Sequence, residues 1–99
     1  PFRNIVYLGD SETDVPCMKL VTSNGGHAVG VYDPVTRDTS LVRTMMRHHR
    51  IRYYAPADYR EGSALDTLMK LIVDRTAANE RLEEIHDDDV REAALREDE

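Results

Sequence analysis

The sequence has little cysteine, no long apolar run and no excess of positive charge, and each absence excludes a class of protein. Cys17 is the single cysteine among 99 residues, so no internal disulfide can form, which fits a reducing compartment. No apolar stretch approaches the roughly 18 residues of a membrane-spanning helix, and no basic segment leads into an apolar one at the start. We therefore expect a cytoplasmic domain without a membrane partner. Cys17 is expected to pack in the interior, as free cysteines commonly do.

Charge is unevenly distributed along the chain. The formal net charge is −6, and residues 74–99 carry 11 acidic and 4 basic side chains, a net of −7 that leaves +1 for residues 1–73. Neither part has the basic surface of a nucleic-acid-binding protein, so no nucleic-acid partner is expected. We expect one small domain over residues 1–78, followed by an acidic helical tail over residues 79–99 that frays into solvent.

The apolar residues occur in the order strand, helix, strand, helix, strand, helix. Residues 5–8 form an apolar run without alternation, as in a strand buried on both faces of a parallel sheet. Strands are also predicted over residues 28–32 and 51–55, the last at a sheet edge, and helices over residues 15–22, over 38–49 and from Ser63 onward. Ser63 and Asp66 resemble a capping box. This order predicts an α/β fold with three parallel strands and crossover helices.

A pair of aspartates follows the first predicted strand. Gly9-Asp10 ends the strand, and Asp14 lies four positions later. Asp10 is therefore expected at the carboxyl end of a strand, where open α/β sheets bind their ligands. Two carboxylates held in this way suit Mg²⁺, which takes one or two protein carboxylates besides water and phosphate oxygens. The alternative is that Asp10 is a turn residue and that Asp14, or Thr13, caps the next helix.

Several segments together resemble the haloacid dehalogenase-like (HAD) hydrolases. The resemblance covers about residues 2–75, and it rests on Gly9-Asp10-x-x-x-Asp14 with Val15-Pro16-Cys17, on Gly25-Gly26, on Val29-Gly30-Val31-Tyr32-Asp33-Pro34, and on the segment from Ala55 to Ser63. It implies a three-layer Rossmann-like core in which the first of these segments is the family's fourth motif, which binds the Mg²⁺ cofactor of phosphoryl transfer. The resemblance implies that Asp10 is a direct metal ligand and that Asp14 is the second acidic position, direct or through water.

The residues that carry the family's chemistry are absent from this sequence. HAD hydrolases use a nucleophilic aspartate in an Asp-x-Asp-x-Thr/Val motif at the end of an earlier strand. The only Asp-x-Asp here is Asp87–Asp89, with no apolar strand before it and Arg91 in the Thr/Val position. The resemblance therefore implies the carboxy-terminal portion of a phosphatase-type hydrolase that acts on a small phosphorylated metabolite. We expect this chain by itself to be inactive.

The strand over residues 5–8 would, in that family, pair with the strand that bears the nucleophile. Without that neighbour an apolar strand edge is exposed, which is a template for pairing. We expect self-association through this edge, or pairing with the missing amino-terminal part. The competing interpretation is a non-catalytic, flavodoxin-like module that binds a metal or another ligand.

Overall fold

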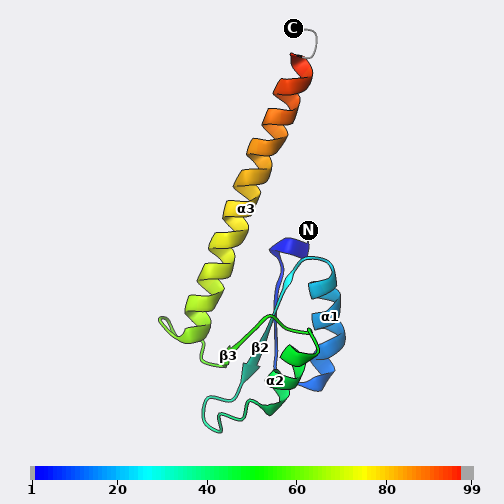
Figure 1. The fold of residues 1–99 in the computed structure, drawn as a ribbon. Helices are drawn as coiled ribbons and strands as arrows, with labels where there is room; N and C mark the ends of the chain where they lie inside the picture. The colour runs from blue at the N-terminus through cyan, green and yellow to red at the C-terminus, as the bar shows by residue number, and fades with distance from the viewer. Residues whose placement is uncertain (1, 97–99) are drawn as a thin grey trace.

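The computed structural model describes residues 2–96 and has a mixed α/β fold (Figure 1). Within this range, three parallel strands form one open sheet, accompanied by three α-helices and two short 3-10 turns. The elements are η1 (Phe2–Asn4), β1 (Val6–Gly9), η2 (Glu12–Asp14), α1 (Val15–Ser23), β2 (His27–Tyr32), α2 (Ser40–Arg47), β3 (Tyr53–Pro56) and α3 (Ala64–Leu95). The predicted element order and the three parallel strands are confirmed.

The sheet has the strand order β1-β2-β3, with Gly9 aligned with Gly30 and Val31 with Ala55. β3 lies at an edge, as predicted. β1 lies at the other edge, because within residues 2–96 it pairs only with β2. The first three residues of β1 are therefore half-buried, whereas the sequence predicted a strand buried on both faces.

The helices cover the two faces of the sheet separately, so the domain has three layers (Figure 1). Successive side chains of a strand point to opposite faces, and each face carries its own buried cluster. Helices α1 and α2 cover one face, where the buried residues are Met18, Ala28, Val42, Met45 and Ile51. Helix α3 covers the other face, where they are Val29, Val31, Ala55, Leu65 and Ile72. A Cβ atom on Gly30 would lie 2.7 Å from Ile51 Cδ1 and 2.9 Å from Val42 Cγ1, so these side chains pack closely against β2 because Gly30 has no side chain.

The second helix and the third strand begin two residues later than predicted. Helix α2 begins at Ser40, because the carboxylate of Asp38 accepts a hydrogen bond from the Ser40 amide, 2.9 Å, in a turn before it. It ends at Arg47, and His49 adopts a positive φ of 58° just beyond. Strand β3 begins at Tyr53, because Ile51 inserts into the core before the strand starts pairing.

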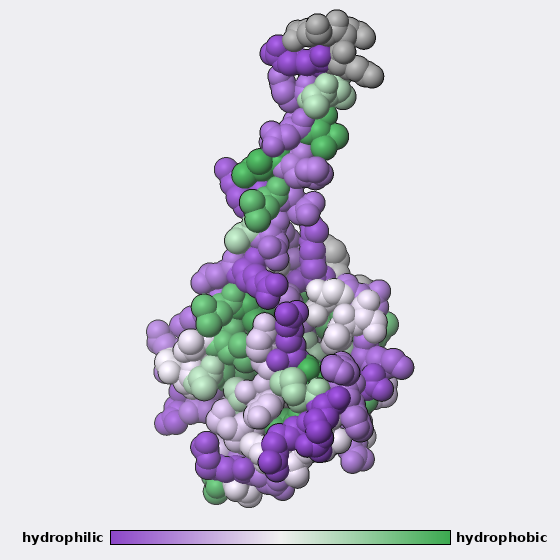
Figure 2. All heavy atoms as spheres, in the orientation of Figure 1, coloured by the Kyte–Doolittle hydropathy of each residue, from purple (hydrophilic) through white to green (hydrophobic). Residues whose placement is uncertain are grey.

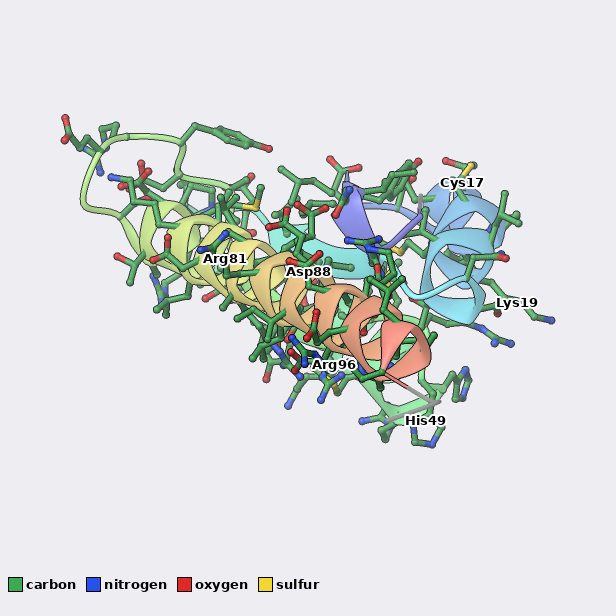
Figure 3. The ribbon with its side chains drawn as sticks, turned by 90° about the horizontal axis from the view of Figure 1, so that it is seen from above. Cys17, Lys19, His49, Arg81, Asp88 and Arg96 are labelled. Carbon is green, nitrogen blue, oxygen red and sulfur yellow. The ribbon has the colours of Figure 1, made fainter. Side chains whose placement is uncertain are left out.

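Cys17 is exposed, so the expectation that it packs in the interior is wrong. In α1 the inward residues are Met18 and Val21, three apart, and Cys17 lies off this face. Figure 3 shows Cys17 and Lys19 projecting outward from the helix.

Helix α3 continues without a break through the predicted boundary at residue 78. It has 32 residues, about 48 Å at 1.5 Å per residue, and every residue from 81 to 96 is exposed. The molecule measures 66 × 29 × 17 Å as a result. Figure 2 shows apolar patches on the protruding part, where the large exposed apolar residues are Leu82, Ile85, Val90 and Leu95. Within the described residues, the predicted acidic tail is helical from residue 79 to Leu95, and residues 97–99 lie outside the described part of the chain.

Within residues 2–96, no helix is long and apolar enough to cross a membrane.

Candidate functional site

The two predicted metal-binding aspartates lie in one tight loop between β1 and α1. Gly9 makes this loop possible, because a Cβ atom there would lie 2.3 Å from Met18 Cε and 2.8 Å from Asp14 Cβ. Real Cβ atoms essentially never approach other atoms so closely, so any side chain at position 9 would push the loop away from the strand. The missing side chain therefore lets Asp14 and α1 pack against the strand end.

The carboxylate of Asp14 is turned back toward the strand and accepts hydrogen bonds from four donors. Its Oδ1 atom accepts from the Tyr7 hydroxyl at 2.8 Å. Its Oδ2 atom accepts from the amides of Asp10 and Ser11, at 2.9 and 3.1 Å, and from the Ser11 hydroxyl at 3.3 Å. Each carboxylate oxygen offers about two lone-pair positions, so Oδ2 is fully engaged in holding the loop and Oδ1 retains one position beside its bond to Tyr7.

These hydrogen bonds shift two pKa values in opposite directions. Donation by the Tyr7 hydroxyl, followed by donation from the Asp10 amide, lowers the pKa of Asp14. The same bond makes the Tyr7 proton harder to remove and raises the pKa of Tyr7 to about 12. Asp14 is therefore a carboxylate and Tyr7 a neutral hydroxyl at neutral pH.

Asp10 differs from Asp14 in being exposed. Within residues 2–96, no hydrogen bond or ion pair engages its carboxylate, whereas its backbone amide donates to Asp14. The chain thus presents a charged oxygen donor, with its backbone held in place, one residue beyond a strand of a parallel sheet. This donor set fits a magnesium ion that keeps several water ligands.

The two aspartates are therefore brought together, but their carboxylates are used differently. The Asp14 Oδ2 atom is fully occupied by three donors, and its Oδ1 atom accepts only from Tyr7, whereas the Asp10 carboxylate is free on both oxygens within residues 2–96. Asp14 occupies the N-cap position of α1, as the alternative predicted, but its side chain makes no capping hydrogen bond to this helix. The Thr13 hydroxyl instead lies 2.7 Å from that of Ser11.

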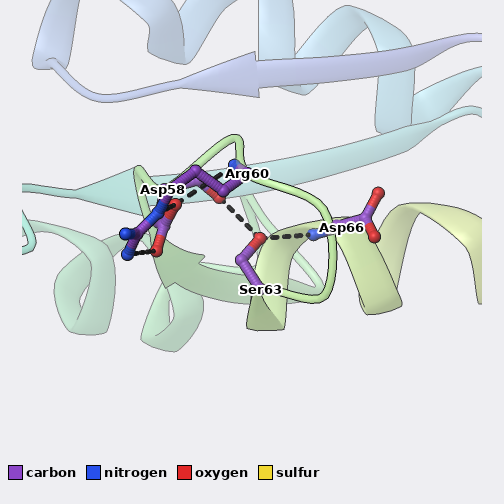
Figure 4. A network of polar contacts seen from close by, with 4 residues as sticks. All are labelled: Asp58, Arg60, Ser63 and Asp66. Carbon is purple, nitrogen blue, oxygen red and sulfur yellow. Dashed lines mark hydrogen bonds and ion pairs between the residues drawn. The ribbon is translucent and has the colours of Figure 1, made fainter.

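The other two strands also lead into aspartates, but both of these carboxylates are engaged locally. Asp33 follows β2 and accepts from the Val35 amide at 2.7 Å. Asp58 follows β3 and binds the Arg60 guanidinium through Nε at 2.9 Å and Nη2 at 2.7 Å (Figure 4). Those bonds lower the pKa of Asp58 to about 2. Across residues 2–96, no group of three or more His, Cys, Asp or Glu side chains could hold a metal ion.

The loop around Asp58 serves to begin α3. The Ser63 hydroxyl donates to the Asp58 carbonyl at 2.7 Å and accepts from the Asp66 amide at 3.1 Å (Figure 4). Asp66 in turn accepts from the Gly62 amide at 2.9 Å. The predicted capping box is thus present in its Ser63 half, while Asp66 reaches one residue further back than a standard box.

Sequence reasoning missed Tyr7 and Ser11 as parts of this site. Ser11 and Asp14 have the spacing of a capping box, a signal that could have placed the Asp14 carboxylate on the Ser11 amide. Tyr7 carried a weaker signal, because a buried tyrosine hydroxyl usually finds a hydrogen-bond partner. Nothing in the spacing indicates which partner it finds.

No protein-family model matches the chain, and no curated protein or solved structure matches it.

Proposed function

We propose that the chain is the carboxy-terminal part of the core of a Mg²⁺-dependent HAD hydrolase of the phosphatase type. The observation that carries the proposal is Asp10, whose exposed carboxylate is free of partners within residues 2–96 and whose amide is fixed by Asp14. The position also supports it, since ligands of open α/β sheets bind beyond the carboxyl ends of the strands.

In this proposal Asp10 and Asp14 have separate tasks. Asp10 is the direct Mg²⁺ ligand. Asp14 keeps the Asp10 backbone in place and adds negative charge behind it, at direct or water-mediated range. The bound ion would neutralise charge on a phosphoryl group. The small phosphorylated metabolite of the whole enzyme would bind at the same carboxyl ends of the strands.

The uncovered side of β1 supports the proposal that another part of the enzyme packs against this strand. Within residues 2–96, one edge of β1 has no neighbouring strand. An apolar groove of about 250 Å³ lies between β1 and α3, with Val6, Ile72, Val73 and Ala77 in its lining. We propose that the amino-terminal part of the enzyme, which would supply the nucleophilic aspartate, covers this side. Without that part, a second copy would pair there.

Metal binding is tested most directly with Mn²⁺, which takes the same oxygen ligands as Mg²⁺ and broadens nearby NMR signals. We expect broadening of the amide signals of residues 9–14 and its loss in Asp10→Asn. The matched control is Asp33→Asn, which alters a carboxylate after the next strand and should leave the broadening unchanged. Broadening confined to residues 87–89, or broadening that persists in Asp10→Asn, would refute the site.

The competing function is a non-catalytic, flavodoxin-like module that binds a metal or another ligand. It is favoured by one observation, that the only Asp-x-Asp of the chain lies on the exposed part of α3. The coding sequence upstream of Pro1 separates the two functions. An apolar strand ending in Asp-x-Asp-x-Thr/Val there supports the enzyme, and a native product without one supports the module. In either case, the purified chain should not hydrolyse phosphate esters, because it lacks the nucleophilic aspartate. Measurable Mg²⁺-dependent hydrolysis would contradict the proposal that the nucleophile lies in the amino-terminal part.

A further inference from the structure

A second cavity lies at the amino ends of the strands, at the opposite end of the sheet from Asp10. Its volume is about 260 Å³, and its lining includes Arg3, His27, Arg52, Arg75, Thr76 and Asn79. Arg3 precedes β1, His27 begins β2, Arg52 precedes β3, and the remaining three residues belong to α3. The cavity is therefore formed where the amino ends of all three strands meet the middle of α3.

The lining of this cavity is positively charged and contains no acidic residue. Arg3, Arg52 and Arg75 are exposed, and within residues 2–96 their guanidinium groups form no hydrogen bond or ion pair. Arg60, Arg81 and Arg91, in contrast, are each bound to a carboxylate. Three like charges around one concave surface repel one another, and an anion among them removes that repulsion.

Other polar groups in the lining are already oriented by hydrogen bonds. The Nε2 atom of His27 lies 3.1 Å from the Arg3 carbonyl and 3.4 Å from the Thr76 hydroxyl, which ties η1, β2 and α3 together around the cavity. The backbone amides of Gly25 and Gly26, which also border it, donate to carbonyls of α1 at 3.2 and 2.8 Å. A ligand would therefore be held by the guanidinium groups rather than by a glycine loop.

We propose that this cavity binds a small phosphate-bearing metabolite, at a site separate from the metal site at Asp10. Guanidinium groups match the geometry of phosphate oxygens and bind them in pairs of hydrogen bonds, and three of them favour a doubly charged group over a single carboxylate. The volume is below the roughly 300–1,000 Å³ of sites for drug-sized ligands. It therefore excludes a dinucleotide and suits a small molecule.

The test is a titration of the ¹⁵N-labelled chain with inorganic phosphate, without divalent cations and at constant ionic strength. We expect saturable shifts at Gly26, His27 and Thr76. Binding should weaken about tenfold in Arg52→Gln and in Arg75→Gln, because each loses a charge-assisted hydrogen bond. Arg43→Gln, which removes an exposed arginine of α2, should bind like the wild type. Acetate, with one carboxylate, should bind more weakly than phosphate.

Two results would overturn this proposal. The first is the absence of saturable shifts at the cavity, or equal weakening in Arg43→Gln. The second is a salt-sensitive oligomer that is lost in both cavity variants while phosphate shifts nothing, which would assign the cavity to the acidic α3 of another copy. Asp10→Asn should leave the phosphate shifts unchanged, so the failure of one site is distinguishable from the failure of the other.

Discussion

The two halves of α3 belong to one helix but are held by different interactions. The packed half, residues 64–80, begins with the Ser63 cap and buries Leu65 and Ile72 against the sheet. The free half, residues 81–95, buries nothing. Its side chains form ion pairs between Arg81 and Glu84, Asp88 and Arg91, and Glu92 and Arg96.

This difference separates the nucleation of a helix from its extension. The first turn of a helix is costly to form, and isolated helices below roughly 12–15 residues are marginal in water. Tertiary packing supplies the nucleus in the packed half, so the free half needs only favourable propensity and local pairs, each worth about 0.2–0.5 kcal/mol. Substitutions in the packed domain and in the free half should therefore differ sharply in their effects.

The largest difference is expected between two isoleucines of α3. Ile72→Ala leaves a cavity under the sheet and should lower the free energy of unfolding by about 2–5 kcal/mol. Ile85→Ala, at a side chain 47% exposed, should change it by less than about 0.5 kcal/mol. Urea denaturation followed by circular dichroism measures both. Equal losses of unfolding free energy in the two variants would show that Ile85 is buried in solution by contact with another molecule.

A smaller difference is expected between two aspartates. Asp14→Asn replaces a half-buried carboxylate that accepts four hydrogen bonds with an amide that cannot accept them all, and should cost about 1–3 kcal/mol. Asp88→Asn breaks an exposed ion pair and should cost about 0–1 kcal/mol. Asp10→Asn is the control beside Asp14, and it should leave stability unchanged because the Asp10 carboxylate supports nothing else. Comparable losses at positions 10 and 14 would contradict the separation of their roles.

The pH dependence of stability should arise in the packed domain, where hydrogen bonds lower the pKa values of Asp14, Asp58 and Asp66. A carboxyl group whose pKa is lower in the folded state contributes stability above its unfolded value, here 3.8, and loses it as the pH falls through the folded value, about 2 for Asp58. The midpoint of thermal unfolding should therefore fall between about pH 4 and pH 2. The decline should be shallower in Arg60→Gln, which removes the largest cause of the Asp58 shift. An unchanged decline in that variant would argue against the Asp58–Arg60 pair.

The smallest effect is expected from Glu92→Gln in the free half. Loss of the ion pair with Arg96 should weaken the helix locally by about 0.2–0.5 kcal/mol. Faster amide hydrogen exchange in the last turn of α3 would show this loss, with the denaturation midpoint unchanged. High salt should erase the difference, because it screens exposed pairs. A shift of the global midpoint would mean that the end of α3 contacts the rest of the protein.

The apolar pattern was sufficient for the strands, the helices and their order, because burial determines these features. It was insufficient where a side chain had to choose among nearby partners. The spacing of Asp14 suits a helix cap, a loop acceptor or a metal ligand, and the choice depends on the Tyr7 hydroxyl and on the space that Gly9 leaves. Arg91 likewise has two candidate partners on its helix face, Asp87 four residues before it and Asp88 three residues before it, and it pairs with Asp88. The arginine-lined cavity could not be predicted from the sequence, because its arginines come from segments that are far apart in the chain.

Helix α3 also has a mechanical consequence. The helix is packed against the sheet along its first half and unsupported along its second, so the second half behaves as a stiff arm anchored by the packed half. The free half is about 22 Å long at 1.5 Å per residue, so a tilt of about 5° where it leaves the packed half moves its tip by about 2 Å. Any change in how the sheet face under Ile72 is packed would thus be magnified at the far end. The distance between two spectroscopic labels, one on the sheet and one near Leu95, would report this displacement and so reveal binding of another protein segment along β1.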